Sequence, residues 1–304
     1  MSKTGDKDKK TPWLLAIRPK TLPAAAAPVI VGTALAFAGQ NFQVVPALAC
    51  LLVALLLQIG SNLANDVYDY EKGTDRGKRL GPTRVTQAGL LTPREVKGGM
   101  WGVFGLTAVI GLTLILRGGW PILVLGLAAI LSAIAYTGGP YPLGYHGLGD
   151  LFVFIFFGLA ATAGTYYLQA GEITPVVWAM AAAMGFLTVD ILVVNNLRDI
   201  DTDRKANKKT LAVRLGEKGA VGEYTLLMAV AFLIPVFLWI VKLAPFWGLL
   251  TWAAAPLAFQ WAKFITHKRG AALNKALAGT GRLELIYATL FALGMILSVW
   301  AGSD

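Results

Sequence analysis

The sequence predicts an all-α protein, a multi-spanning membrane helix bundle of about nine transmembrane helices. Composition is the first reason, since 56% of the 304 residues are apolar and only 14% are charged, whereas soluble domains have about 45–50% apolar and about 25% charged residues. The second reason is that the apolar residues form long blocks, such as 44–60 and 226–241, that are apolar on every face. Such blocks are typical of membrane spans, and they lack the alternating pattern of about ten residues that a barrel strand would show.

About 20 apolar residues cross the hydrocarbon core of a bilayer, so the chain accommodates about nine spans with short loops. The first expected span follows a lysine-rich segment, the second contains Cys50, and Arg117 separates the third from the fourth. The second and sixth end in acidic segments, and Lys242 follows the seventh. The expected spans are residues 13–38, 43–70, 94–117, 119–137, 147–170, 174–197, 219–242, 245–265 and 282–301.

Two further expectations concern the first residues and the domain organisation. Residues 1–12 are expected to form a polar cytoplasmic N-terminus, and residues 13–304 a single transmembrane domain. The first span is too long for the core of a signal peptide, and no small-residue cleavage site follows it, so we expect it to remain an uncleaved helix.

The positive charge is distributed very unevenly over this map. Every Lys and Arg except Arg117 and Lys242 falls on one face of the membrane. By the positive-inside rule that face is cytoplasmic, which predicts a multi-pass protein of the plasma (bacterial inner) membrane with its N-terminus inside and its C-terminus outside. The net charge of +10 is therefore a topology signal, and we expect no nucleic acid partner.

Acidic residues gather at the cytoplasmic ends of the second and sixth expected spans. In the first segment Asn62, Asp66 and Asp69 lie three or four residues apart, so they share one face of a helix. In the second segment Asp199 and Asp203 lie four residues apart and also share a face. Both segments begin with Asn-x-x-x-Asp and are separated by four expected spans, which predicts two four-helix repeats followed by a ninth helix.

Clustered carboxylates near a bilayer repel one another unless a cation neutralises them. Mg²⁺ is bound through one or two carboxylates together with waters and substrate phosphates. Basic residues follow both acidic segments, from Lys72 to Arg84 and from Arg198 to Lys209, and can bind phosphate oxygens. The pattern predicts a metal-bound diphosphate at the cytoplasmic face. For a single acid the alternative is a solvated helix cap, which is our interpretation of Glu71 and Asp201.

Other kinds of site are excluded by what the sequence contains. The single cysteine, Cys50, excludes a disulfide framework and a thiolate metal site. Two histidines, His146 and His267, are too few for a histidine metal set, and a phosphate-cradling G-x-x-x-x-G-K-[ST] run is missing. The Asp199-x-Asp201-x-Asp203 run imitates a calcium loop but has Arg204 where that loop requires glycine.

Both acidic segments resemble the two signatures of the UbiA superfamily of intramembrane aromatic prenyltransferases. Further segments are similar to its subgroup of 1,4-dihydroxy-2-naphthoate polyprenyltransferases, which act in menaquinone biosynthesis. The similarity extends over nearly all of the chain after residue 12, and its most specific part runs from Asn195 to Gly216. The other segments are Arg18-Pro-Lys-Thr-Leu22, Lys72-Gly-Thr-Asp75, Gly81-Pro-Thr-Arg84, Tyr136-Thr-Gly-Gly-Pro140 and Tyr145-His-Gly-Leu-Gly-Asp150.

The resemblance implies roles for individual residues. It implies Mg²⁺ coordination by Asp66, Asp69, Asp199 and Asp203. It implies diphosphate binding by Asn62, Asn65, Arg84, Arg198, Lys205 and Lys209. Asp75 is a further candidate metal ligand, although many family members place a third aspartate closer to the first.

The loop from Tyr136 to Asp150 differs from the hydroxybenzoate enzymes of the family, which carry a Lys-Arg pair there. This difference favours a larger aromatic acceptor whose rings stack on Tyr136, Tyr141 or Tyr145. Interfacial anchoring is the alternative role for these tyrosines. Asp150 is expected either in the aromatic site or as an acid at a helix N-terminus.

The function implied by the resemblance is transfer of a polyprenyl chain from its diphosphate to 1,4-dihydroxy-2-naphthoate, with loss of the carboxylate, to give demethylmenaquinone. The implied partners are then a polyprenyl diphosphate, the naphthoate and membrane lipid. Apolar residues of spans two to six are expected to form the walls of a prenyl tunnel. Another aromatic acceptor is one alternative. A secondary transporter is the other, but transporter acids lie near mid-span, whereas these aspartates lie at helix ends.

Overall fold

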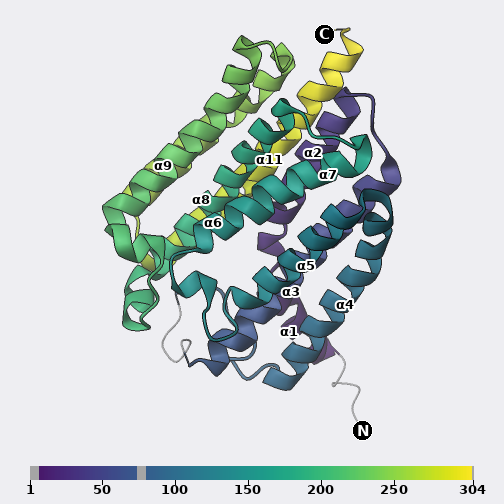
Figure 1. The fold of residues 1–304 in the computed structure, drawn as a ribbon. Coiled ribbons are helices and arrows are strands. Elements are labelled where there is room, and N and C mark those ends of the chain that lie inside the picture. The colour runs from purple at the N-terminus through teal and green to yellow at the C-terminus, as the bar shows by residue number, and fades with distance from the viewer. Residues whose placement is uncertain (1–6, 74–79, 303–304) are drawn as a thin grey trace.

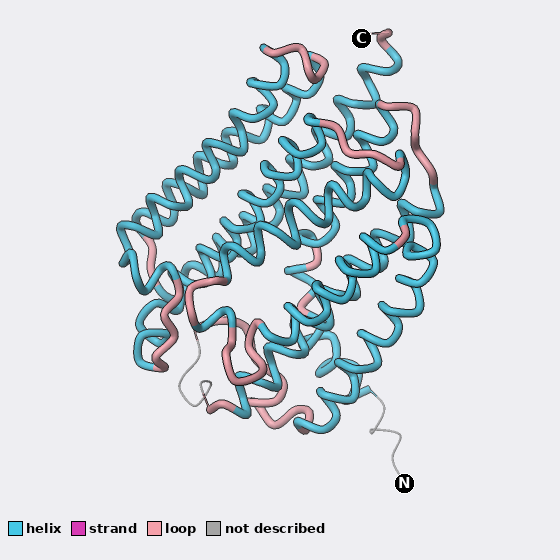
Figure 2. Tube along the Cα trace, viewed as in Figure 1, coloured by secondary structure: helices cyan, strands magenta, loops and turns pink. Residues whose placement is uncertain are grey.

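The computed structural model describes residues 7–73 and 80–302 as a bundle of helices, shown in Figure 1. Asp75 lies outside the described residues. Figure 2 shows helices running the length of the bundle and broad loops gathered at its lower end. The described helices begin with α1 near the end marked N and finish with α11 near the opposite end, marked C.

The helices follow the order of the expected spans. They are α1 (Lys7–Ile17), α2 (Pro23–Ala38), α3 (Val44–Glu71), α4 (Pro93–Gly118), α5 (Trp120–Ala135), α6 (Gly149–Val153), α7 (Ala161–Ala170), α8 (Pro175–Lys205), α9 (Leu211–Ile240), α10 (Ala255–His267) and α11 (Leu273–Trp300). A π-helical segment, Phe154–Ala160, joins α6 to α7, and a 3₁₀ segment, Phe246–Ala254, precedes α10. Shorter 3₁₀ turns are Pro19–Thr21, Leu143–Tyr145 and Gly270–Ala272.

Within the described residues, six helical segments are long and apolar enough to cross a membrane, and a bent pair raises the number to seven. The protein is therefore all-helical with several membrane-spanning helices, as the sequence predicts. The fourth expected span is the short helix α5, and the eighth is divided between a 3₁₀ segment and α10. The count of nine spans stays a prediction.

The first expected span is a bent pair of helices. The segments Thr11–Thr21 and Pro23–Ala38 meet at an angle of 48°. Arg18 adopts a left-handed backbone conformation (φ 54°, ψ 67°) directly before Pro19. The left-handed residue interrupts the helix because it changes the direction of the backbone, and Pro19 has no amide proton with which to continue the helical hydrogen bonds.

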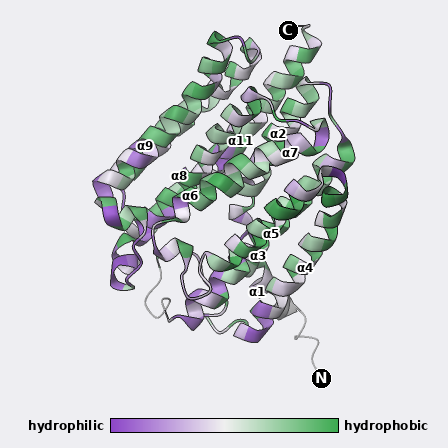
Figure 3. Ribbon diagram, in the orientation of Figure 1, coloured by the Kyte–Doolittle hydropathy of each residue, from purple (hydrophilic) through white to green (hydrophobic). Residues whose placement is uncertain are grey.

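The largest apolar core lies among α2, α8, α9 and α11, with Leu187, Tyr224 and Phe291 almost wholly buried. The π-helical segment packs against α8 through two glycines, because a Cβ on Gly158 would lie 2.4 Å from Gly185 Cα. By contrast, every residue of α5 is at least partly exposed. Figure 3 shows hydrophobic colour along the helices and hydrophilic colour at their lower ends. The predicted aspartate motifs lie at the ends of α3 (Val44–Glu71) and α8 (Pro175–Lys205).

Candidate active site at the ends of α3 and α8

Asp69, near the end of α3, is the centre of a group of interacting side chains at this end of the bundle. Its carboxylate is buried and lies 2.5 Å from Arg84 Nη2 and 3.4 Å from Lys208 Nζ. The phenolic oxygen of Tyr145 donates a hydrogen bond to Asp69 Oδ1 at 2.6 Å. Three loops, those between α3 and α4, α5 and α6, and α8 and α9, therefore converge on one carboxylate.

Asp66 has a different environment, one turn earlier on the same helix. It is 1% exposed, and its Oδ2 and Oδ1 accept hydrogen bonds from the backbone amides of Val85 and Thr86, both at 3.0 Å. The loop 80–92 is thus anchored on α3. At the other end of this loop, Thr92 and Glu95 form a capping box that starts α4.

The two asparagines of the first motif are bound to neighbouring segments. Asn62 Nδ2 donates to the carbonyl of Ile17 at 2.9 Å and to Thr21 Oγ1 at 3.0 Å, across the bend between α1 and α2. Asn65 Oδ1 accepts a hydrogen bond from Thr137 Oγ1 at 3.0 Å, and its backbone carbonyl accepts one from Arg84. Asn62 therefore holds the bend, while Asn65 lies at the junction of the two loops.

The second motif is arranged around Arg198, which is 2% exposed. Its Nε and Nη2 donate to the two carboxylate oxygens of Asp199 at 2.9 and 2.5 Å. Asp203, one turn further, lies within electrostatic range of Asp199, Asp69 and Lys208. The two aspartate motifs therefore face one another across the ends of α3 and α8.

Lys208 is a candidate site residue that the sequence did not predict. Its ammonium reaches Asp69, and its backbone amide donates to the carbonyl of Asp203 at 2.8 Å. Lys205 and Lys209, the two lysines selected from the sequence, have exposed side chains at the rim. Only the conformation of the loop distinguishes Lys208 from Lys209, because both lie in the same basic run.

The loop after α8 is also tied to the loop after α5. The backbone amide of Lys209 donates to the carbonyl of Tyr145 at 2.8 Å, and Arg214 Nη2 donates to the carbonyl of His146 at 2.7 Å. The Tyr145 ring lies 4.4 Å from Lys208 Nζ and 5.2 Å from Lys72 Nζ, measured to the ring centroid. Tyr145 therefore contacts Asp69 through its hydroxyl and two lysines through its ring.

Lys72 is the first residue after α3 and adds positive charge to the rim. Its Nζ donates to the carbonyl of Gly139 at 3.0 Å. Partial burial lowers the pKa of Lys72; the nearby Lys208 acts in the same direction and Asp69 opposes it. The ammonium is thus easier to deprotonate than that of a fully solvated lysine.

Tyr136 and Asp150 lie beside the two motifs, at the base of the loop between α5 and α6. Tyr136 is within electrostatic range of Asp150, Asp203 and Asp69. A Cβ on Gly149 would lie 2.8 Å from the Tyr136 hydroxyl, so a larger residue there would displace the end of the Tyr136 side chain. Both carboxylate oxygens of Asp150 are buried, and neither finds a hydrogen-bond partner among residues 7–73 and 80–302. Asp150 therefore has unused capacity to bind a polar group.

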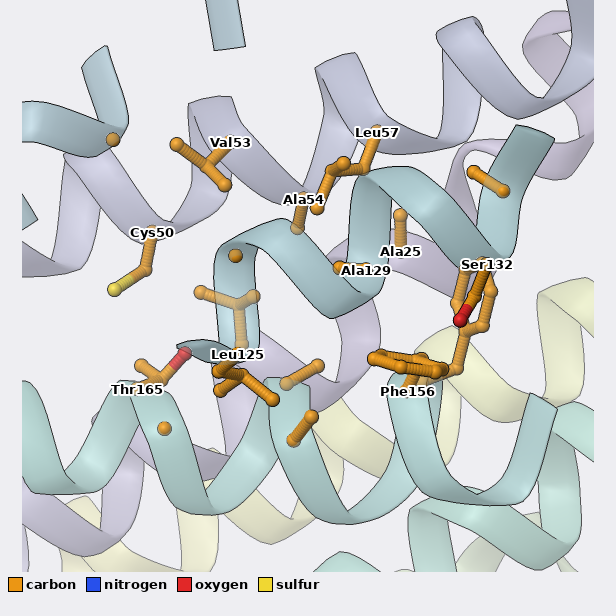
Figure 4. Close-up of a pocket in the computed structure, with 18 of the residues that line it drawn as sticks. Ala25, Cys50, Val53, Ala54, Leu57, Leu125, Ala129, Ser132, Phe156 and Thr165 are labelled. Atoms are coloured by element: carbon orange, nitrogen blue, oxygen red, sulfur yellow. The ribbon is translucent and has the colours of Figure 1, made fainter. Parts of the chain in front are cut away.

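An apolar cavity of about 210 Å³ begins next to this group and extends away from it into the bundle (Figure 4). Ser61 and Tyr136 line it near the first motif, and Cys50, Leu114 and Leu168 line it far along the helices. Expected span one, through α2, contributes to the walls, whereas the expected contribution of span six is not found among the lining residues. Figure 4 labels Ala25, Cys50, Val53, Ala54, Leu57, Leu125, Ala129, Ser132, Phe156 and Thr165 in these walls.

The donor set of the two motifs fits Mg²⁺ bound together with a phosphate ligand. Asp69, Asp199 and Asp203 provide hard oxygen donors on two facing helices. Among the described residues there is no preformed group of three or more metal-binding side chains. Mg²⁺ usually takes one or two carboxylates and completes its shell with phosphates and waters, so carboxylates on two facing helices suit an ion that is bound together with a diphosphate.

Comparison with curated proteins finds relatives over almost the full chain. The chain is 40% identical over 296 residues to a 1,4-dihydroxy-2-naphthoate octaprenyltransferase of Escherichia coli, covering 95% of this chain and 96% of that protein. It is 42% identical over 281 residues to a protein of the same name from Mycobacterium tuberculosis, covering 92% and 95%.

Solved structures share the fold. A UbiA homolog from Aeropyrum pernix superposes with a TM-score of 0.68 at 18% identity, covering 91% of this chain and 98% of that one. A UbiA homolog from Archaeoglobus fulgidus, solved with GPP and Mg²⁺ bound, gives 0.66 at 16% identity, covering 92% and 99%. The model of the UbiA prenyltransferase family matches residues 25–286. With this match and the relatives above, the chain belongs to the UbiA prenyltransferase family.

Proposed function

We propose that the protein transfers a polyprenyl chain from its diphosphate to 1,4-dihydroxy-2-naphthoate, with loss of the carboxylate, to form demethylmenaquinol, the reduced form of demethylmenaquinone. One observation carries this proposal. The ion pair between Asp69 and Lys208 brings the two aspartate motifs together directly beside an apolar cavity. A polar head and a long apolar tail thus have adjoining sites. The names of the relatives from Escherichia coli and Mycobacterium tuberculosis support the same reaction.

Within this proposal the aspartates Asp66, Asp69, Asp199 and Asp203 would act as the Mg²⁺ ligands. Asp66 belongs to the same motif and, in addition, anchors the loop 80–92 through two backbone amides. Arg84 and Lys208 lie on the Asp69 side and are placed to contact diphosphate oxygens. Lys205 and Lys209 would bind the incoming diphosphate at the rim, and Asp75 remains a proposed ligand outside the described residues.

For three of the predicted diphosphate ligands, the hydrogen bonds in the structure suggest a more specific role. Asn62 donates its amide hydrogens to the bend at Ile17 and Thr21, so we assign it to holding that bend. Asn65, whose Oδ1 accepts a hydrogen bond from Thr137, stays a proposed diphosphate or metal contact. Arg198 is committed to Asp199, and we assign it to orienting that carboxylate.

The apolar cavity is the proposed binding site for the prenyl tail. Its walls come from α2, α3, α4, α5 and the α6–α7 segment, and they are almost entirely apolar. Burying the apolar surface of an isoprenoid there is favourable because it replaces contact with water. The mouth at Ser61 and Tyr136 then places the first isoprene unit next to the two aspartate motifs.

Tyr136 and Asp150 are the proposed residues of the acceptor site, and Tyr145 lies beside it. Asp150 has two buried oxygens without a hydrogen-bond partner in the described part of the chain, and a hydroxyl of the naphthoate is a suitable donor. Tyr136 offers an aromatic face at the mouth of the cavity. Tyr145 faces Asp69 with its hydroxyl, so we assign it to the diphosphate side of this site.

In the proposed reaction the bond between the allylic carbon and the diphosphate oxygen breaks, and both electrons leave with the diphosphate. Arg84 and Lys208 stabilise the charge that develops on the leaving group, and bound Mg²⁺ supplies further electrophilic stabilisation there. The apolar walls exclude water from the allylic cation. A ring carbon of the naphthoate that bears hydrogen then forms the new carbon–carbon bond and loses its proton, while the carboxylate-bearing carbon loses carbon dioxide and takes up a proton. The net change is the exchange of the carboxylate for the prenyl group, and the product is a quinol.

The proposed location is the bacterial inner membrane, with the active site and N-terminus in the cytoplasm and the C-terminus outside. The distribution of Lys and Arg supports this orientation. The opposite positions of the first and last described helix ends agree with it (Figure 1).

The purified protein, incubated with Mg²⁺, octaprenyl diphosphate and 1,4-dihydroxy-2-naphthoate, should form a product whose mass equals that of the prenylated, decarboxylated naphthoquinol. Chelation of Mg²⁺ should abolish the product, and Asp69→Ala and Asp199→Ala should reduce it strongly. Absence of any product, or full Mg²⁺-dependent activity in both variants, would refute the proposal. If 4-hydroxybenzoate is prenylated in preference to the naphthoate, the acceptor assignment is wrong and the alternative of another aromatic acceptor is correct.

A further inference from the structure

The guanidinium of Arg198 is held inside the protein by three side chains. In addition to its two bonds to Asp199, Nη2 donates to Asn195 Oδ1 at 2.8 Å and Nη1 donates to Asn274 Oδ1 at 2.9 Å. A guanidinium has five N–H donors, and this set uses four of them. Arg198 therefore fixes the direction of the Asp199 carboxylate.

Asn274, in the first turn of α11, uses both ends of its amide. Its Oδ1 accepts the hydrogen bond from Arg198. Its Nδ2 donates to the backbone carbonyl of Leu80 at 2.7 Å, although Asn274 and Leu80 are 194 positions apart. Leu80 opens the described part of the loop 80–92, which carries Arg84 and is anchored on Asp66. One amide group thus joins the loop of the first motif to the arginine of the second.

The same loop lies directly against Arg198. A Cβ on Gly81 would lie 2.7 Å from Arg198 Nη2 and 2.8 Å from its Cζ. A larger residue at this position would have to displace the guanidinium, which four hydrogen bonds hold in place. The approach is independent of the Asn274 hydrogen bonds, and it indicates that the loop and Arg198 form one packed unit.

We infer that Asn274 is a positioning residue, which sets the placement of the loop 80–92 relative to Asp199 and so the distance between the oxygen donors of the two motifs. The inference rests on the proposed function, because it gives Asp199 the role of a Mg²⁺ ligand. Asparagine suits this position because its side chain accepts from a guanidinium with one atom and donates to a carbonyl with the other.

Two substitutions separate the two hydrogen bonds. Asn274→Leu removes both at similar volume. Asn274→Asp keeps the acceptor for Arg198 but turns a second oxygen toward the Leu80 carbonyl, which accepts and cannot donate. The matched control is Asn41→Leu, because Asn41 Nδ2 also donates to a backbone carbonyl, that of Gly39 at 2.8 Å, in the turn between α2 and α3 away from both motifs.

The first measurement is hydrogen exchange of the loop 80–92 in the purified protein. Both Asn274 variants should exchange the loop amides faster than the wild type, while Asn41→Leu should not. The second is binding of Mn²⁺, as a paramagnetic substitute for Mg²⁺, in the presence of inorganic pyrophosphate. The Mn²⁺ affinity should fall about tenfold in Asn274→Leu and less in Asn274→Asp, which retains the bond to Arg198.

Wild-type loop exchange and wild-type Mn²⁺ affinity in both Asn274 variants would overturn the inference. If Asn274→Leu does not fold, Asn274→Asp decides by the same two readouts. If the wild-type protein transfers no prenyl group at all, the proposed function fails, and the exchange of the loop amides still decides the role of Asn274.

Discussion

Lys208 Nζ lies 3.4 Å from Asp69 Oδ1, although 139 residues separate the two positions. Both side chains are largely buried, at 16% and 2% exposure. The contact joins the loop after α8 to the end of α3, and so the second motif to the first.

Replacing Lys208 by alanine should lower kcat/KM for prenyl transfer by about tenfold to a hundredfold. A charge-assisted hydrogen bond contributes about 1.5–3 kcal/mol, and Lys208 is also placed to contact the leaving diphosphate. Steady-state kinetics with saturating naphthoate and varied polyprenyl diphosphate measures this loss. Lys263→Ala, an exposed lysine on α10, serves as the control and should behave as wild type. An unchanged kcat/KM in Lys208→Ala would remove Lys208 from the site.

The anchoring role of Asp66 predicts a loss of stability. Asp66→Ala leaves the backbone amides of Val85 and Thr86 without their acceptor, and it should lower the free energy of unfolding by about 2–4 kcal/mol. The apparent Tm of the detergent-solubilised protein, compared with that of Asp201→Ala, measures this. If Asp66→Ala loses activity while its Tm equals that of wild type, Asp66 acts as a ligand and does not anchor the loop.

Tyr145→Phe tests the hydrogen bond to Asp69 separately from the aromatic ring. The variant removes the donor at 2.6 Å but keeps the ring near Lys72 and Lys208. We expect kcat/KM for the polyprenyl diphosphate to fall about fivefold to twentyfold, as loss of a bond to a buried charge implies. The KM for the naphthoate should change little. A large rise in that KM instead would return Tyr145 to the acceptor site.

The apolar cavity predicts a dependence on the length of the prenyl chain. Ala54 lines the cavity from α3 (Figure 4), so Ala54→Trp should fill part of it. Turnover of octaprenyl diphosphate should fall at least tenfold, whereas dimethylallyl diphosphate, which needs only the mouth, should be affected much less. The control is Ala108→Trp, on the exposed side of α4. Equal losses for both donors would show that the tail lies elsewhere.

The lowered pKa of Lys72 predicts a shift in the alkaline limb of the pH profile. Partial burial favours the neutral amine, so Lys72 loses its charge at a lower pH than an ordinary lysine would. Arginine cannot be deprotonated in this range. In Lys72→Arg the fall of kcat/KM at high pH should therefore occur at higher pH than in wild type. An alkaline limb at the wild-type position would mean that Lys72 does not contribute to it.

The features that the sequence predicts well all lie in regular helices. The ends of α3 and α8 and the shared faces of their aspartates follow from spacing alone, because helical geometry fixes which residues are neighbours. Positions in loops do not follow from spacing. Asn207, after α8, has a left-handed backbone conformation (φ 55°), and this turn precedes Lys208, which points inward, and Lys209, which is exposed.

Hydrogen-bond partners that are distant in the chain could not be predicted from the sequence either. The amides that bind Asp66 and the carbonyl that binds Asn274 belong to backbone groups, which carry no signal in the residue types. The walls of the cavity could not be assigned from the sequence either, since a helix that is apolar on every face does not reveal which face meets lipid. The packing of α2 against α3 and α7 decides that α2 lines the cavity.

Because the apolar cavity beside α5 is partly open, we expect the prenyl chain of the donor to compete with membrane lipid for it. In a bilayer, acyl chains reach such a surface, and the isoprenoid must displace them. The occupancy of the site is then governed by the mole fraction of the donor among the lipids, and not by its amount per volume of water. Diluting the same quantity of donor into more vesicle lipid, at constant protein, should therefore slow the reaction.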